Sequence, residues 1–90
     1  MTLIERDLKL KRLESLLENR EEDASKLAVQ LAEIWIDGLW EVCDDSFSEF
    51  LASEFEMSEP DAFMAMKLAA SDGMLEADVA AKVEAEFERL

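Results

Sequence analysis

The stretch SFSEFLASEFEMSEPDAFMAMKLAA, residues 46–70, decides the fold class of this chain. It contains two segments in which apolar residues recur every three or four positions, the period of an amphipathic helix. Ser46 and Ser58 stand directly before these segments, and serine is a preferred helix N-cap. Pro60 lies in the first turn of the second segment, where proline is tolerated. The stretch therefore predicts two helices, over residues 47–55 and 59–70.

Helical patterns continue on both sides of this stretch. Downstream, Gly73 suits a left-handed helix cap and precedes another amphipathic segment. Upstream, Thr2 and Glu5 have the spacing of a capping box. The upstream pattern reaches Val42, either as one long helix or as two helices, the second of which starts at Arg20 or Ala24, and we favour two. The further predicted helices are residues 3–18, 20–42 and 75–88.

Composition supports an all-α fold. The 90 residues are rich in Ala, Leu and Glu, which favour helices, and β-branched residues are scarce. No segment alternates polar and apolar residues over a useful length, so no strand is predicted. Gly38 falls inside the predicted helix 20–42, where we interpret it as a site of close helix crossing. We expect residues 1–90 to form a single domain, a compact bundle of four to five helices with short connections.

The charge and the rare residues exclude several functions. Asp and Glu number 23 and Lys and Arg number 9, for a net charge of −14, which disfavours direct binding to nucleic acid. The chain has no His and one Cys, so His-based catalysis, a Cys–His pair and most transition-metal sites are excluded. No phosphate-binding loop or nucleophile motif accompanies the carboxylates. We predict a protein that is not an enzyme and has no cofactor or metal.

The first residues of the chain are charged, so we expect no signal peptide there. Its first seven residues carry three charges, and no run approaches 18 uncharged apolar residues. The sequence therefore predicts no membrane association and a location in the cytoplasm. Under the leading hypothesis, this is the cytoplasm of a bacterial host cell.

Negative charge is concentrated after Lys26. Residues 1–26 hold six bases and seven acids, whereas residues 27–90 hold three bases and sixteen acids. Glu33, Asp37 and Glu41 follow one another at four-residue steps, and like charges at this spacing destabilise a helix by about 0.2–0.5 kcal/mol per pair. One explanation is solubility, together with favourable placement of acids at helix starts. The other is a row of carboxylates that binds a partner.

The spacing of this row favours a cationic partner. Four helical residues span about 6 Å, and a nucleic-acid strand carries one phosphate per about 3.4 Å, so the row could replace selected phosphates at a basic groove. Trp40, or the methionines, could add an apolar anchor. The predicted partner-binding residues are Glu33, Asp37, Glu41, Asp44, Asp45, Glu49, Glu54, Glu56 and Trp40.

A second hypothesis uses apolar surfaces instead. Leu3, Leu10, Leu13 and Leu17 could form the seam of a homodimer, although fewer than three heptads are present. An adaptor of this kind would also use Trp35 and the methionines, and its binding would be largely insensitive to salt.

Residues 46–70 also resemble small helix-turn-helix proteins of phages and mobile elements. The resemblance is carried by an aromatic-led helix, a turn that ends in Met57 and Ser58, and a second helix. It implies a DNA-reading second helix, but Glu56 stands where the turn glycine is usual, and Glu59 and Asp61 begin that helix. Phosphate would repel a recognition helix with these charges. A DNA-binding regulator of this type is the third hypothesis.

In size and acidity the whole chain is similar to phage-encoded inhibitors of bacterial defence, the anti-CRISPR and anti-restriction proteins. The resemblance implies a decoy that imitates nucleic acid. Our leading hypothesis is therefore an acidic inhibitor that binds the basic DNA- or RNA-binding groove of a phage-defence nuclease or a CRISPR surveillance complex.

Overall fold

Polar N-caps determine where most helices of this chain begin. A computed structural model describes residues 2–90. In it the side chains of Thr2, Asp23, Ser46 and Ser58 each accept a hydrogen bond from a backbone N–H in the first turn of the helix that follows. Thr2 and Glu5 form the expected capping box, with N···O distances of 3.1 and 3.3 Å. The elements are α1 (Leu3–Glu18), α2 (Ala24–Ile36), the 3-10 helix η1 (Leu39–Val42), α3 (Phe47–Phe55), α4 (Glu59–Ser71) and α5 (Ala77–Arg89).

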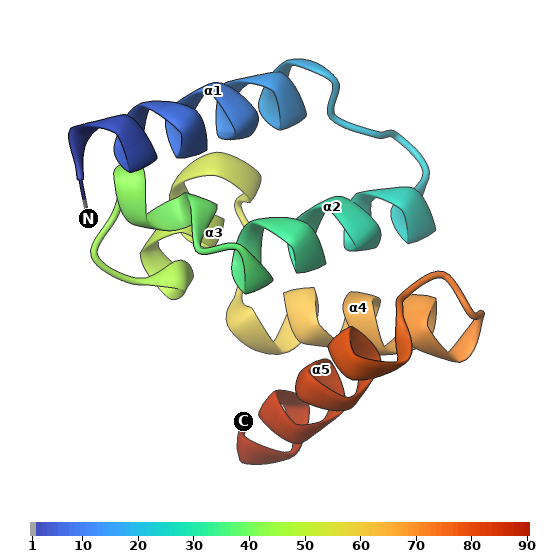
Figure 1. Ribbon diagram of the computed structural model, residues 1–90. Coiled ribbons are helices and arrows are strands. Elements are labelled where there is room, and N and C mark those ends of the chain that lie inside the picture. Colours follow the sequence, from blue (N-terminus) through green and yellow to red (C-terminus); the bar gives the residue numbers. More distant parts are fainter. Residues whose placement is uncertain (1) are drawn as a thin grey trace.

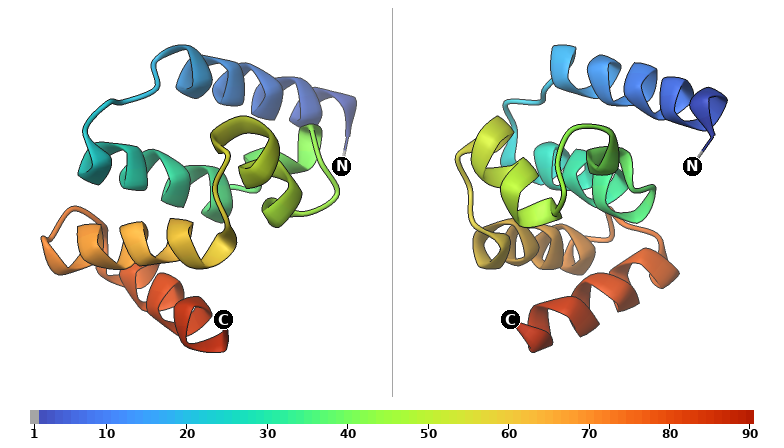
Figure 2. Two further views of the ribbon diagram at one scale, coloured as in Figure 1. Left: turned by 180° about the vertical axis from the view of Figure 1, so that it is seen from behind. Right: turned by 90° about the vertical axis from the view of Figure 1, so that its left-hand side faces the viewer.

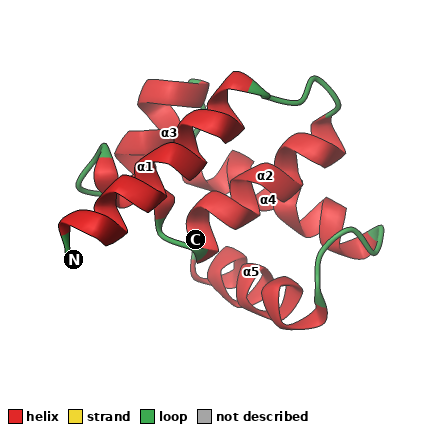
Figure 3. Ribbon diagram, turned by 45° about the horizontal axis from the view of Figure 1, so that its top comes forward, coloured by secondary structure: helices red, strands yellow, loops and turns green. Residues whose placement is uncertain are grey.

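The helices stack in layers around α2. Figure 1 shows α1 on one side of α2 and α4 on the other, with η1 and α3 at one end and α5 crossing α4. The two views in Figure 2 show the same order from behind and from the side. Helix α4 packs most extensively, against both α2 and α5, whereas α1 rests mainly on η1. Residues 2–90 contain no strand (Figure 3), so the predicted all-α bundle is confirmed.

Aromatic rings from α2, α3 and α4 form the centre of the core. The Phe63 ring meets the Trp35 ring edge-on at 4.9 Å between centroids, and the Phe47 ring at 5.9 Å. Phe50 and Phe63 are fully buried. The other large, fully buried side chains are Leu13, Leu31, Ile34, Leu51, Met66 and Val83. The Cα radius of gyration is 12.6 Å, close to the about 12 Å expected for a compact chain of this length.

The predicted helix over residues 20–42 starts at Ala24, the later of the two starts that the sequence allows, and its predicted end at Val42 is wrong. Asp23 caps α2 so that it begins at Ala24, and the Asp23 carboxylate accepts from the N–H groups of two residues in the first turn. Gly38 has φ +64°, a left-handed conformation that ends α2 at Ile36. Gly38 is therefore a helix stop and not a helix crossing. The single long helix over residues 3–42 is also wrong, because the backbone leaves the helical conformation at Asn19 (φ −105°, ψ 37°), whose side-chain amide donates to the Ser15 carbonyl.

The bounds of the other helices differ little from the prediction. Helices α1 and α3 have the predicted bounds, and α4 is one residue longer. Gly73 has φ +76°, and its N–H and that of Met74 donate to the Ala70 and Ala69 carbonyls, the hydrogen bonds of a Schellman motif. Helix α5 begins at Ala77 instead of residue 75, because this connection occupies the residues before it.

Candidate functional site

The predicted row of carboxylates does not run along one helix. Glu33 lies on α2, Asp37 is the C-terminal cap of α2, and Glu41 lies on η1. The left-handed turn at Gly38 separates the last two and changes the direction of the chain. The expectation of a continuous acidic face with a constant 6 Å step is therefore wrong.

Three of the eight predicted acids are neutralised by bases that precede α2. Arg12 donates to Glu33 through Nε at 3.1 Å and also through Nη2. The Nζ atom of Lys9 lies 3.4 Å from Oε2 of Glu41, and Nη2 of Arg20 lies 3.9 Å from Oε2 of Glu54. The hydrogen bond to Glu33 and its charge raise the pKa of Arg12 above its usual value, and Asp37 adds to this effect. Glu33, Glu41 and Glu54 are among the predicted partner-binding residues, but each is already paired with a base of the chain itself.

The other five predicted acids remain without an ion pair among residues 2–90. Asp37, Asp45, Glu49 and Glu56 are exposed, and Asp44 is half-buried. Asp44 and Asp45 lie just before α3, Glu49 lies in its first turn, and Glu56 is its C-terminal cap. These four carboxylates, which we call the α3 acids, are thus concentrated on and around one short helix.

Glu56 holds an unusual backbone conformation. Its φ is +53°, and it is the one non-glycine residue among residues 2–90 with a positive φ. An L-residue in the left-handed region costs about 1–2 kcal/mol, a cost that glycine avoids. This is the turn position at which the helix-turn-helix resemblance implies glycine. A carboxylate therefore stands where glycine would be more stable.

Trp40 is held by the protein's own core. It lies on η1, half-buried, with its ring 6.4 Å from that of Phe47. Its Nε1 atom is covered and has no hydrogen-bond partner among the described residues. The ring is therefore not free to insert fully into a partner, although part of it is accessible.

Cys43, the one thiol, is exposed among the α3 acids but is a poor nucleophile. Its pKa is raised above the usual value, first by partial desolvation and then by the charges of Asp44 and Glu54, while Arg6 of α1 lowers it. Because the thiolate is the reactive form, a raised pKa reduces reactivity at neutral pH.

The segment that resembles a helix-turn-helix lacks free positive charge on its second helix. The one base of α4, Lys67, places its Nζ atom 4.8 Å from the centroid of the Phe87 ring on α5. The outward side of α4 instead exposes Met64 and Leu68. Neither side chain provides the donors with which proteins bind phosphates.

Of the four leucines predicted as a dimer seam, two face the core, Leu10 is half-buried and Leu3 is exposed. Leu13 is buried and Leu17 packs against the core. The exposed apolar residues of α1 are instead Leu3, Ile4 and Leu8, of which Leu3 is 82% exposed. The methionines are divided between the two environments, because Met66 is buried whereas Met64 and Met74 are exposed.

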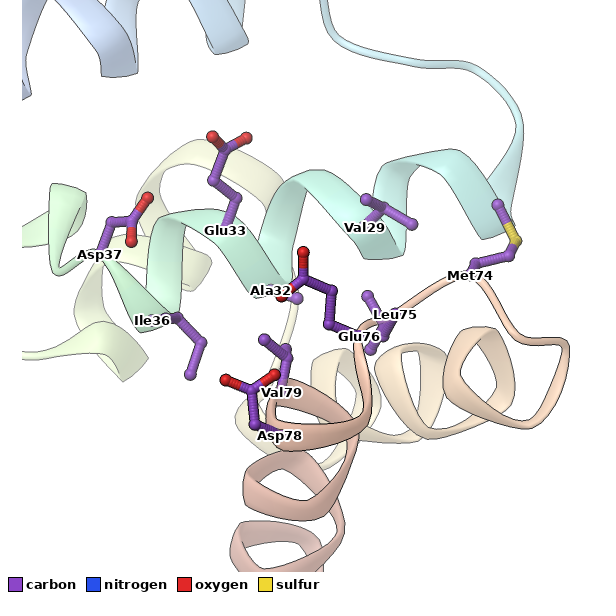
Figure 4. A pocket seen from close by; sticks show the side chains of 10 residues that line it. All are labelled: Val29, Ala32, Glu33, Ile36, Asp37, Met74, Leu75, Glu76, Asp78 and Val79. Atoms are coloured by element: carbon purple, nitrogen blue, oxygen red, sulfur yellow. The ribbon is translucent and has the colours of Figure 1, made fainter.

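A groove that the sequence does not predict lies between α2 and the start of α5 (Figure 4). Its apolar lining is Val29, Ala32, Ile36, Met74, Leu75 and Val79, and its acidic lining is Glu33, Asp37, Glu76 and Asp78. The groove has a volume of about 460 Å³. One signal could have indicated it: Val29, Ala32 and Ile36 form a second apolar series at three- and four-residue steps, beside the series that faces the core.

Comparisons with protein-family models, with curated proteins and with solved structures find no match for this chain. Within residues 2–90, no helix combines the length and the apolar character needed to cross a membrane. The same residues contain no group of three or more side chains placed to hold a metal ion. The arrangement of charge and apolar surface therefore carries the functional argument.

Proposed function

We propose that this protein binds a cationic, nucleic-acid-binding surface of a partner protein and blocks it, with carboxylates in the places of phosphates. The observation that carries the proposal is the group of α3 acids, which lie on and around one short helix and form no ion pair among residues 2–90. A carboxylate can accept hydrogen bonds from Lys and Arg as a phosphate oxygen does. Four such groups would compete for a basic groove.

The conformation of Glu56 supports a binding role for these acids. Solubility could be obtained from any surface position, yet this glutamate occupies a strained left-handed position. Backbone strain of this kind is common where a side chain has a function. The helix dipole explains Asp44, Asp45 and Glu49 near the start of α3, but it opposes an acid at the C-terminal end.

We also propose which class of protein the partner belongs to. The chain's size and acidity resemble those of phage-encoded inhibitors of bacterial defence, so we propose a phage-defence nuclease or a CRISPR surveillance complex as the target. A host protein with the same basic groove would satisfy the same chemistry.

Competition with nucleic acid tests the proposal. The protein is immobilised, bacterial proteins that bind it are captured and purified, and the displacement of fluorescent DNA or RNA from them is followed by anisotropy. We expect competitive displacement whose affinity falls steeply with salt, by a slope of about −0.9 for each ion contact. The variant Asp45→Asn/Glu49→Gln/Glu56→Gln should reduce this slope by about 2–3.

The matched control removes the same charge elsewhere. Asp72→Asn/Glu84→Gln/Glu88→Gln neutralises three exposed acids on or after α4 and on α5, and it should leave the displacement almost unchanged. Equal losses in both triple variants would show that only net charge matters. A complex that nucleic acid and salt leave intact would contradict the decoy proposal.

A second candidate function is an apolar interaction module, favoured by the exposed Leu3, Ile4 and Leu8 of α1. Binding through this face would be insensitive to salt and would be lost in Ile4→Ser/Leu8→Ser, whereas the triple variant of the α3 acids would retain it. The two variants therefore separate the two candidates.

A further inference from the structure

The groove beside α2 exists because α5 packs on α4 and makes far fewer contacts with α2. In Figure 1, α5 crosses α4, and its residues Lys82, Ala85 and Glu86 still border a hollow beside Trp35 and Ile36 at the end of α2. The side chains that line the opening come from α2 on one side and from the α4–α5 connection and the start of α5 on the other (Figure 4). The fold therefore leaves a gap between two helices that no other described element covers.

The floor of this groove is apolar and partly open to water. Val29, Ile36, Leu75 and Val79 are each half-buried. Shallower hollows continue the groove at both ends, where one shares Ile36 and the other shares Val29 with the central part. The apolar strip thus follows most of α2, whose 13 residues span about 20 Å at 1.5 Å per residue.

Both edges of the central groove are acidic. Glu33 and Asp37 lie along the α2 edge, and Glu76 and Asp78 lie along the α5 edge (Figure 4). No base lines this central part, whereas Lys82 lines the hollow at one end of the groove and Lys26 lines the hollow at the other. Arg12 binds Glu33, but the other three carboxylates have no ion pair among residues 2–90. An occupant must therefore offer apolar groups to the floor and positive charge to both edges.

We propose that this groove binds an amphipathic helix of a partner protein, one with an apolar stripe flanked by Lys and Arg. Such a helix places its apolar side chains at i, i+3, i+4 and i+7 along the strip and extends its basic side chains to the edges. The described residues offer no sheet edge to which an extended peptide could add. The contact between Arg12 and Glu33 shows that an arginine from a neighbouring helix reaches the α2 edge. The proposal deepens the proposed function and depends on it for the cationic nature of the partner, but it uses a surface apart from the α3 acids.

A synthetic peptide tests the proposal with the full chain. The probe is a helix-forming peptide of about 16 residues, long enough to span the groove, with leucines at i, i+3, i+4 and i+7 and lysines or arginines on both flanks. Its control has glutamates in place of those bases. Titration followed by amide chemical shifts should move the signals of Val29, Ile36, Leu75 and Val79, and the acidic control should bind at least about tenfold more weakly.

Two variants probe the groove itself. Glu76→Gln/Asp78→Asn removes charge from one edge and should weaken binding of the basic peptide about tenfold, whereas the matched Asp72→Asn/Glu88→Gln should not. Val79→Thr keeps the shape of the floor but adds a hydroxyl, and it should also weaken binding.

The outcomes are distinct for the two proposals. Shifts confined to residues 44–56, or no binding at all, would overturn the groove proposal. Displacement of nucleic acid by the protein could still be observed in either case. Concentration-dependent shifts at the groove without peptide, with a dimer in sedimentation, would mean that a second copy occupies it and would also overturn the proposal. Peptide binding at the groove without displacement of nucleic acid would support the groove and contradict the decoy.

Discussion

Helix α1 and the rest of the molecule differ in how they are stabilised. We call the rest, formed by α2, η1 and α3–α5, the body. Helix α1 contributes one buried residue, Leu13, and exposes Leu3, Ile4 and Leu8, whereas the body contributes the rest of the buried core. The charges also differ, because residues 1–26 have a net charge of −1 and residues 27–90 one of −13. Three bases of α1 and the connection after it reach acids of the body.

This difference shows how the chain partly balances its own acidity. Lys9, Arg12 and Arg20 approach Glu41, Glu33 and Glu54 as a basic partner would, but they leave the α3 acids without bases. Exposed ion pairs contribute little stability, so α1 depends mainly on Leu13 and its partly buried neighbours. We therefore expect the body to be rigid and α1 to detach more easily.

The largest effect should come from the core of the body. Phe63→Ala removes a fully buried ring that contacts Trp35 and Phe47, and it should lower the free energy of unfolding by about 3–5 kcal/mol. Leu8→Ala on α1 is the control, because Leu8 is 63% exposed, and it should change the free energy by less than about 0.5 kcal/mol. Urea denaturation followed by circular dichroism measures both. Similar losses in the free energy of unfolding for both variants would show that α1 contributes as much to stability as the body.

Gly38→Ala should have the next largest effect, because it strains the turn that connects α2 to η1. The alanine would adopt φ +64°, which costs about 1–2 kcal/mol. Its Cβ would also lie 3.3 Å from Cδ of Glu41, the acid that binds Lys9.

Gly73→Ala is the matched comparison for this change. Gly73 also has a positive φ, but a Cβ there would meet nothing within 4 Å. The loss of stability in thermal or urea unfolding should therefore be smaller for Gly73→Ala than for Gly38→Ala. Hydrogen exchange of α1 should become faster in Gly38→Ala only, because only this change disturbs a contact with α1. Equal effects at both glycines would contradict the role of Glu41.

Glu56→Gly should stabilise the protein while it weakens partner binding. Glycine relieves the left-handed strain at φ +53°, and its greater freedom in the unfolded chain offsets part of the gain, so we expect about 0.5–1 kcal/mol of added stability. Glu56→Gln keeps the strain and removes the charge, so it should leave stability almost unchanged. Urea denaturation gives the stability, and nucleic-acid displacement gives the binding. A destabilised Glu56→Gly would mean that the glutamate side chain makes a contact that outweighs the strain.

Removing bases from the α1 side should have a small effect on stability. Lys9→Gln breaks one exposed ion pair, which should cost about 0.2–0.5 kcal/mol. Arg20→Gln also removes a hydrogen bond to the Glu54 carbonyl and a contact with the Phe55 ring, so it should cost more. Lys9→Gln should lose its difference from the unaltered protein as salt is raised, since salt screens this pair, whereas Arg20→Gln should keep part of its difference. Hydrogen exchange should become faster in α1 and remain unchanged in α4. Lys82→Gln is the control, because Lys82 has no ion pair among residues 2–90.

The sequence predicts the local features of this fold better than the contacts between distant segments. Ser46 and Ser58 lie next to the helices that they cap, so the bounds of α3 and α4 follow from neighbouring residues. Gly38 is locally ambiguous, since a glycine fits either a helix crossing or a left-handed stop. The pair formed by Lys9 and Glu41 joins residues 32 apart. It arises only once α1 docks on η1, and helix-spacing rules do not address such a contact.

For the candidate site too, the sequence predicts the local features but not the contacts between distant segments. That the acids are concentrated after Lys26 is visible in the sequence, but which of them remain free depends on where α1 places its bases. The groove depends on the limited packing between α5 and α2, which is a consequence of how α5 packs on α4. An apolar series such as Val29, Ala32 and Ile36 indicates only that a second face of α2 is apolar, and does not indicate whether that face is covered.

Cys43 offers the finest measure of the two regions, because both act on its thiol. Partial desolvation, Asp44 and Glu54 raise its pKa, and Arg6 of α1 lowers it. The thiolate fraction at pH 8 should therefore be smaller in the folded protein than in the chain unfolded in urea, and alkylation by iodoacetamide should be slower. The difference should vanish as the pH rises past the folded pKa, where both states are ionised. Asp44→Asn should speed alkylation at pH 8 and Arg6→Gln should slow it, whereas Lys82→Gln, on α5, should do neither. If Arg6→Gln leaves the rate unchanged while Asp44→Asn raises it, the charge of α1 does not reach the α3 acids, and the body alone sets the potential that a cationic partner would meet.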